Sequence, residues 1–258
     1  MHVRPPEFYE FISEGLTVDV AAFWGAGFLD GRHQPGTPSW RWPELAGPGT
    51  GEGGVLAGLR PLPALTVACE EWLATVPAAV ATLRPLGVRV VVAAGSDDNT
   101  AIVRRRPGLP FADGSFDVVL NRHEAFDALD VHRITAPGGR FLTQQVGSDE
   151  ERSVRALLGL DVQQLNWDLD VACRQLRSAG WHLAGMAEER PPAYFTDVAA
   201  LVGYMRTTPW CFEDVLCTAD PWSTNGPLLE ALRDVHDRCR EGPVEAVAHR
   251  FWVSAQRA

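Results

Sequence analysis

Apolar and polar positions alternate with two different periods along this chain. Short apolar runs rich in β-branched residues indicate strands, and longer stretches with apolar residues three or four apart indicate helices. The clearest case lies between residues 109 and 147, where the run Phe116–Leu120, a helical stretch, the turn Pro137-Gly138-Gly139 and the run Arg140–Val146 follow one another. Two strands joined by a helix form a β-α-β unit, in which the strands are parallel.

The same pattern recurs along most of the sequence. Further strands are predicted at Trp42–Ala46, Leu65–Cys69, Val88–Ala93, Trp181–Ala187 and Val244–Ala255, and helices at Val76–Leu83, Asp149–Leu158, Trp167–Ala179, Thr196–Met205 and Leu228–Cys239. Strands that alternate with helices are typical of α/β proteins with a parallel sheet and helices on both faces. The sequence therefore predicts a doubly wound, Rossmann-like α/β fold with a seven-stranded, mostly parallel sheet.

Two segments differ from this alternation. Residues 1–44 form a predicted N-terminal cap that is rich in aromatic residues, among them Trp24. Such a segment either packs onto the main domain or closes a pocket over a small ligand. Residues 45–258 form the main domain, in which residues 207–226 are irregular and aromatic.

The composition excludes several functions. The chain has 258 residues, 46% of them hydrophobic, and a formal net charge of −10, so binding to nucleic acid is not expected. All 23 basic residues are arginine, which excludes Schiff-base and P-loop chemistry on a lysine. The five cysteines are scattered and the histidines lack metal-ligand spacing, so neither disulfides nor a metal site is predicted. Without a signal peptide or a long apolar stretch, the chain is expected to be cytoplasmic, with no membrane partner.

Ligands of open parallel sheets bind at the carboxyl ends of the strands, so polar residues there are candidate site residues. The glycines Gly49, Gly51 and Gly53 follow the first predicted strand and let the backbone approach a ligand closely. Glu70 ends the second strand and can accept both hydroxyls of a ribose, while Trp72 can stack on a base. An ordinary glycine-rich turn and a solvated acid are the alternatives.

Two further strand ends carry polar groups. Ser96 and Asp97 follow the third strand, either as ligand contacts or as a capped turn, and the fourth strand ends in Asn121, Arg122, His123 and Glu124. His123 is the candidate catalytic base, with Glu124 as the residue that orients it, because an imidazole of ordinary pKa can take a proton from a hydroxyl or an amine. A structural histidine bonded to a backbone carbonyl is an equal alternative.

The segment Leu109–Gly147 resembles the carboxyl half of class I S-adenosylmethionine (SAM)-dependent methyltransferases, with "LPFADGSFDVV" leading into a strand and "PGG" into the next. Matches to an actinobacterial-type subgroup of these proteins are Arg122-His123-Glu124 after "DVVLN", "QQVG" at Gln144–Gly147, Glu70-Glu71-Trp72, Pro85–Val88 and the "LxxLHxR"-like helix Leu232–Arg238. The resemblance covers the chain from about Trp40 onward. It implies that the last strand inserts antiparallel into the sheet.

The resemblance also implies a cofactor and an activity. SAM would be held by Gly49, Gly51, Gly53, Glu70, Trp72, Ser96, Asp97, Asn121 and Arg122. The implied activity is methyl transfer to a small apolar or aromatic metabolite of specialised metabolism. A substrate-binding insert is expected at about residues 193–227, where Tyr204, Trp210, Phe212 and Trp222 would line the acceptor pocket together with Trp24. Simple packing of these aromatic side chains is the alternative.

One departure from the family pattern keeps other functions open. The family usually carries an acidic residue two positions before the first glycine, and Gly47 stands there. The chain could therefore be a SAM-binding enzyme of this fold that catalyses a cyclisation, isomerisation or decarboxylation, or a non-catalytic scaffold. A nicotinamide-dependent dehydrogenase is disfavoured because Gly49, Gly51 and Gly54 have the GxGxxG spacing but no good strand sequence precedes them. A homodimer is kept as an open alternative to a monomer.

Overall fold

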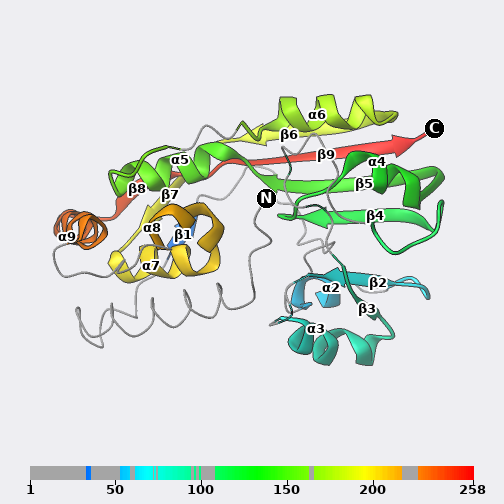
Figure 1. Cartoon of the computed structure of the whole chain (residues 1–258), viewed down its shortest axis with the longest axis horizontal. Coiled ribbons are helices and arrows are strands. Elements are labelled where there is room, and N and C mark those ends of the chain that lie inside the picture. Colours follow the sequence, from blue (N-terminus) through cyan, green and yellow to red (C-terminus); the bar gives the residue numbers. More distant parts are fainter. Residues whose placement is uncertain are drawn as a thin grey trace. The chain divides into compact units, whose positions relative to one another are not determined.

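The computed structural model describes residues 33–35, 53–58, 62–71, 73, 75–93, 96, 99, 108–162, 166–216 and 226–258 (Figure 1). The chain divides into two compact units. Unit 1 consists of Met1–Thr37, Asp149–Gln164 and Arg190–Ala248, and unit 2 of Pro38–Ser148, Leu165–Glu189 and His249–Ala258.

Unit 2 contains a four-stranded sheet made of β4 (Phe116–Arg122), β5 (Thr135–Val146), β6 (Trp181–Glu189) and β9 (Arg250–Arg257). The strand order is β4-β5-β9-β6. Strands β4 and β5 are parallel, whereas β9 runs antiparallel to both of its neighbours, β5 and β6. The last strand therefore enters the sheet antiparallel between two strands that precede it in the chain, as the sequence resemblance implied.

A second, two-stranded sheet in unit 2 pairs β2 (Val67–Glu70) with β3 (Arg89–Val92) in parallel. The connection runs through α3 (Val76–Leu83) and the 3-10 helix η2 (Arg84–Leu86), and the short helix α2 (Gly54–Gly58) precedes β2. Six strands are thus described in unit 2, in two sheets. The predicted strand Trp42–Ala46 lies outside the described residues, so the single seven-stranded sheet is not confirmed.

One face of the four-stranded sheet carries the main core of unit 2. Alternate residues of β5 and β9 are buried on it, namely Phe141, Thr143, Gln145, Phe251, Val253 and Ala255. The helices α4 (Ala128–Ile134) and α6 (Leu169–Ser178) contribute apolar side chains to the same core. Both helices begin at an aspartate, Asp127 and Asp168, whose side chains accept hydrogen bonds from backbone N–H groups of the first turn.

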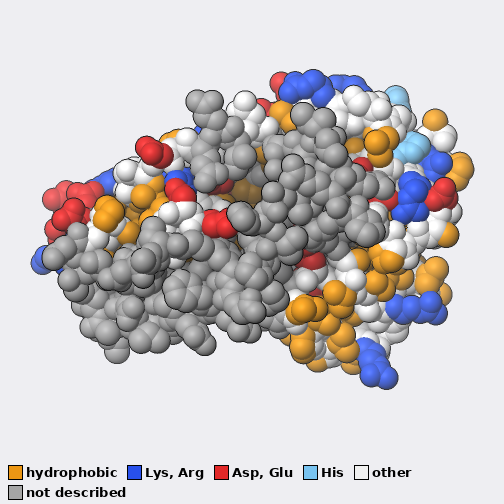
Figure 2. Space-filling model, viewed as in Figure 1, with side chains coloured by type: hydrophobic (Ala, Val, Ile, Leu, Met, Phe, Trp, Pro, Cys, Tyr) orange, Lys and Arg blue, Asp and Glu red, His pale blue; other side chains and the backbone are white. Residues whose placement is uncertain are grey.

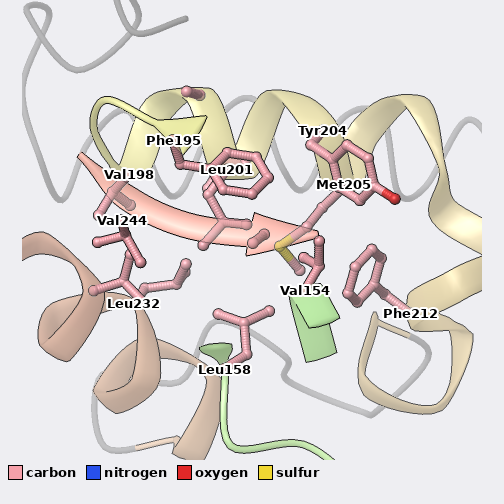
Figure 3. Packing of buried hydrophobic residues seen from close by; sticks show 14 of the residues in the cluster. Val154, Leu158, Phe195, Val198, Leu201, Tyr204, Met205, Phe212, Leu232 and Val244 are labelled. Atoms are coloured by element: carbon pink, nitrogen blue, oxygen red, sulfur yellow. The ribbon is translucent and has the colours of Figure 1, made fainter. Parts of the chain in front are cut away.

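Unit 1 has its own small antiparallel sheet of β1 (His33–Pro35), β7 (Pro192–Phe195) and β8 (Val244–Val247), in the order β1-β7-β8. Its helical elements are α5 (Ser148–Leu157), α7 (Val198–Thr207), η3 (Pro209–Phe212), α8 (Glu213–Leu216) and α9 (Pro227–Cys239). Their apolar faces enclose a core in which Phe195, Leu201, Met205 and Phe212 point toward one another (Figure 3).

The prediction of one strand over Val244–Ala255 was wrong. The structure has two strands there, separated at Ala248 and His249, because β8 pairs with β7 whereas β9 pairs with β5 and β6. The sequence of residues 244–255 is β-forming throughout, and the two strands are separate because they pair with different partners. Unit 1 also extends past the predicted insert 193–227 as far as Ala248.

Candidate functional site at the carboxyl ends of the strands

The carboxyl end of β4 carries a buried polar cluster. Asn121 is 3% exposed, and its Oδ1 accepts hydrogen bonds from Thr143 Oγ1 at 2.7 Å and from Gln145 Nε2 at 2.5 Å. In the register of the sheet, Asn121 lies opposite Thr143, and Gln145 follows on the same face of β5. Three polar side chains therefore meet at one edge of an otherwise apolar face.

Gln145 connects this cluster to two other segments of unit 2. Its Oε1 lies 3.3 Å from Trp167 Nε1 and 3.3 Å from Asn99 Nδ2, and its Nε2 donates to the carbonyl oxygen of Glu124 at 3.0 Å. Asn99 lies beyond β3 and is itself held, since its Oδ1 accepts from the backbone N–H of Phe126 at 3.1 Å. The network thus joins the loop after β3 to the ends of β4 and β5.

Sequence reasoning missed Asn99, Gln145 and Trp167 as members of this site. The "QQVG" match included Gln145 only as part of a family pattern. In the polar loop after β3, the predicted site residues were Ser96 and Asp97. Ser96 is half-buried, and Asp97 lies outside the described residues. No local pattern distinguishes Asn99, because its role depends on contacts with residues far away in the chain.

His123 follows the cluster in an unusual backbone conformation. Its φ is +56°, a left-handed value that few non-glycine residues adopt, and its N–H donates to the carbonyl oxygen of Gln144 at 2.8 Å. The side chain is solvent-accessible, yet protein surrounds it on most sides. This desolvation, followed by the charges of Arg122 and Arg250, holds its pKa well below 6.5. His123 is therefore neutral at pH 7, the state required of a proton acceptor but with reduced basicity.

The neighbours of His123 have different environments. Arg122 pairs in register with Gln144, and both Arg122 and Glu124 are half-buried. The backbone carbonyl of Glu124, rather than its carboxylate, joins the Gln145 network. The structure therefore places all four residues predicted at this strand end, Asn121 to Glu124, within one short segment, with Asn121 the most deeply buried of them.

Glu70 ends β2 as predicted, and its side chain is 4% exposed. A carboxylate at this strand end can accept hydrogen bonds from the hydroxyls of a ribose. The preceding thiol, Cys69, is also buried, and desolvation together with the neighbouring Glu70 charge raises its pKa to about 12. Cys69 is consequently a protonated core residue and not a nucleophile.

Gly53 has a structural reason to be glycine. It precedes α2 with a φ of +81°, and a Cβ built on it would lie 2.7 Å from Leu83 Cγ on α3. Its first contribution is therefore to let the chain turn and pack closely against α3. The other residues predicted around the cofactor here, Gly49, Gly51 and Trp72, lie outside the described residues.

The predicted acceptor residues of unit 1 are placed differently from one another. Phe212 is fully buried in the apolar core, and Tyr204 is 8% exposed with its hydroxyl 3.3 Å from Glu150 Oε1 (Figure 3). Trp210 is 43% exposed. Phe212 therefore packs rather than lines a surface, and Trp210 has the exposure that a ligand contact needs. Trp24 and Trp222 lie outside the described residues.

A cavity of about 320 Å³ lies elsewhere in unit 2. Its walls include Val67 and Arg89, at the amino ends of β2 and β3, and Phe111 and Phe116, which precede and begin β4. It is thus at the opposite end of these strands from Glu70 and Asn121. Figure 2 shows hydrophobic side chains gathered on the visible face over α2 and α3 of the same unit.

Within the described residues, the side chains form no group of three or more metal-ligating residues. Among the same residues, every helix is too short or too polar to cross a membrane.

Two solved structures share this fold over nearly the whole chain. The YcgJ protein from Bacillus subtilis superposes with a TM-score of 0.54 at 15% identity, over 95% of this chain and 98% of that protein. A Bacillus halodurans protein described as a candidate methyltransferase superposes with a TM-score of 0.53 at 15% identity, over 95% of this chain and 99% of that protein. No protein-family model and no curated protein matches the sequence. The chain shares its α/β Rossmann-like fold with these two proteins, and at such low identity the likeness shows the fold alone.

Proposed function

We propose that this protein transfers a methyl group from SAM to a small apolar or aromatic metabolite. The observation that carries the proposal is the polar network of Asn121, Gln145 and Asn99, which joins the loop after β3 to the carboxyl ends of β4 and β5. In open α/β sheets, this edge is where ligands bind. A buried polar network costs stability where one of its groups lacks a hydrogen bond, and Asn121 Nδ2 lacks one among the described residues.

The residues present fit SAM as a ligand. The buried Glu70 carboxylate at the end of β2 is suited to the two ribose hydroxyls, and Ser96 lies in the loop after β3. Asn121 and Arg122 at the end of β4 would lie nearest to the methyl group. In this proposal Gly49, Gly51, Gly53, Trp72 and Asp97 complete the cofactor site. SAM, when bound, supplies an electrophilic methyl group on a positively charged sulfur.

The protein's own contribution would be positioning and proton management. Trp24, Tyr204, Trp210, Phe212 and Trp222 were predicted to line the acceptor pocket, and among the described ones the exposed Trp210 is the strongest candidate for direct contact. His123 is neutral at pH 7 and would accept a proton from an acceptor that must lose one, with Glu124 beside it. Holding the acceptor in line with the methyl group supplies much of the acceleration.

A second candidate function keeps the SAM site but replaces methyl transfer by a cyclisation, isomerisation or decarboxylation. Gly47 favours this second function, because it stands where the family usually has an acid. Without that acid SAM would bind more weakly or in a shifted position, where it would serve as a structural element and not as the methyl donor. A non-catalytic scaffold is the third outcome.

Calorimetric titration of the purified protein with SAM and S-adenosylhomocysteine tests the proposal. Micromolar binding of both, followed by the mass gain of one methyl group in an acceptor, is the expected result. Binding without any methylated product favours the second candidate. If neither compound binds, the protein is a scaffold and the proposal is wrong.

A further inference from the structure

Asn121 carries a hydrogen-bond donor that the fold does not use. Its Nδ2 is buried and has no hydrogen-bond partner among the residues that the structure describes. Buried amide groups in native proteins are nearly always paired, so an orphaned donor calls for an acceptor from elsewhere. Because the oxygen and nitrogen of a carboxamide are told apart by their partners, the direction of Asn121 follows from the surrounding network.

Groups that can only donate or only accept determine the direction of Gln145. The indole Nε1 of Trp167, a donor only, lies 3.3 Å from Gln145 Oε1, and the carbonyl of Glu124, an acceptor only, lies 3.0 Å from Nε2. A second path agrees. The backbone N–H of Phe126 donates to Asn99 Oδ1, which leaves Asn99 Nδ2 to donate to Gln145 Oε1. If the Gln145 amide were reversed, its nitrogen would face the donors of Trp167 and Asn99, and its oxygen would face the carbonyl oxygen of Glu124.

The direction of Asn121 then follows from Gln145. Gln145 Nε2 donates to Asn121 Oδ1 at 2.5 Å, and the hydroxyl of Thr143 donates to the same oxygen at 2.7 Å. These two bonds occupy both lone pairs of Oδ1. Nδ2 is therefore the atom that Asn121 has left to offer, and it offers a donor rather than an acceptor.

We propose that Asn121 selects an oxygen nucleophile, with Nδ2 donating to the oxygen of a carboxylate, phenolate or enolate that receives the methyl group. This inference rests on the proposed function, and it replaces the predicted contact of Asn121 with SAM by a contact with the methyl acceptor. An amine would turn its own N–H toward another donor, whereas an oxygen anion presents lone pairs. The oxygen lone pair forms the new O–CH₃ bond, the S–CH₃ bond breaks with its electron pair going to sulfur, and no proton moves. Such an acceptor needs no strong base, in agreement with the lowered pKa of the adjacent His123.

Contact with Nδ2 requires a local change of conformation, because solvent does not reach this nitrogen. The exposed His123, two residues further on, has a φ of +56° that costs conformational energy in a non-glycine residue. We therefore expect the change of conformation in the segment after β4, which contains this residue.

The first measurement separates the methyl acceptor from the methyl donor as the partner of Nδ2. Two compounds are titrated into the wild type and into Asn121→Asp. One is S-adenosylhomocysteine, and the other is 5′-methylthioadenosine, which lacks the methionyl carboxylate. We expect the variant to change neither affinity by more than about threefold. A loss of about tenfold or more for S-adenosylhomocysteine alone assigns Nδ2 to the methionyl carboxylate and overturns the inference. If the wild type binds neither compound, the proposed function is wrong, and this inference is wrong with it.

The second measurement tests the preference for oxygen. Matched compounds, benzoate against benzylamine and 4-nitrophenolate against 4-nitroaniline, are offered to the S-adenosylhomocysteine complex, and their affinities are measured by saturation-transfer NMR. We expect the oxygen compound of each pair to bind about tenfold or more tightly, and Asn121→Asp to abolish this preference. Asn166→Asp, the same change at an exposed asparagine, should retain it. Equal affinities, an amine preference or no binding of the oxygen compounds overturns the inference.

Gln145→Glu provides a second variant in which Asn121 is intact. The new side chain keeps an oxygen toward Trp167 and places another toward Asn121, so the Asn121 amide should turn and present Oδ1. The preference should then shift toward the amine compounds. A side chain that acted only in packing would not reverse a preference, so an unchanged preference in both variants overturns the inference.

Discussion

Arg155 is the residue whose removal should most weaken unit 1. It lies on α5 with its side chain 1% exposed, and it pairs with both carboxylate oxygens of Asp214 on α8, at 2.9 and 2.6 Å. It also donates to the backbone carbonyls of Asp161 at 2.6 Å and Cys211 at 2.8 Å. One guanidinium thus ties α5 to α8 and to the segment that carries Trp210.

The proposed substitution is Arg155→Met, which keeps much of the apolar volume and removes all the donors. Breaking a fully buried ion pair costs about 3–5 kcal/mol, but the Asp214 side chain is 45% exposed and can regain water. The two backbone carbonyls that lose a charged donor add to the loss. We therefore expect the free energy of unfolding to fall by about 2–4 kcal/mol.

The matched control is Arg152→Met on the same helix. Arg152 pairs with Asp149 at 2.9 Å, with both side chains about one-third exposed, so its loss should cost no more than about 1 kcal/mol. Urea unfolding followed by tryptophan fluorescence measures both variants, and a shifted midpoint at unchanged slope reports stability. Equal midpoints for the two variants would show that Arg155 does not hold α8 in place.

The ion pair of Arg155 and Asp214 should also make the stability of the protein depend on pH. The hydrogen bond from Arg155 is the main cause that lowers the pKa of Asp214 below 3.8 in the folded state. A carboxylate with a lowered pKa contributes stability above its unfolded pKa, and this contribution is lost as the pH falls through the folded value. The wild type should therefore lose this part of its stability below about pH 4, and Arg155→Met should lack that loss.

Three further substitutions test the proposed site. Glu70→Ala should weaken SAM binding by about 1–3 kcal/mol if the buried carboxylate holds the ribose, and an unchanged dissociation constant in the folded variant would exclude that role. Asparagine tolerates the left-handed backbone but is not a base. With an acceptor that must lose a proton, His123→Asn should therefore lower turnover about 10²–10⁴-fold at nearly unchanged SAM affinity, whereas with an oxygen anion as acceptor turnover should be unchanged. Since the pKa of His123 lies well below 6.5, this loss should not vary between about pH 7 and 9, and wild-type turnover in the variant would show that His123 is not the base. Trp210→Ala should raise KM for the acceptor and leave SAM affinity intact, whereas equal loss of both would indicate a structural role.

Most of the described helices and strands could be predicted from local sequence patterns. The helix predicted at Val76–Leu83 has those bounds in the structure, and β4 begins at Phe116 as predicted and extends two residues further, to Arg122. Hydrophobic periodicity and helix-capping residues act over a few neighbouring positions, so they can be read without the fold. Glu70 and Asn121 were found in the same way, because each directly follows an apolar run.

The contacts between distant segments could not be predicted in this way. Residues 244–255 are continuous β-forming sequence, and their division into β8 and β9 follows from different pairing partners. Phe212 and Trp210 are both aromatic residues of one short segment, yet the first is fully buried and the second is exposed. Asn99, Gln145 and Trp167 are distant in the chain, and their hydrogen bonds around Asn121 depend on strand register and loop packing. Local patterns carry no information about such contacts, because their energy arises only when the sheet has brought the residues together.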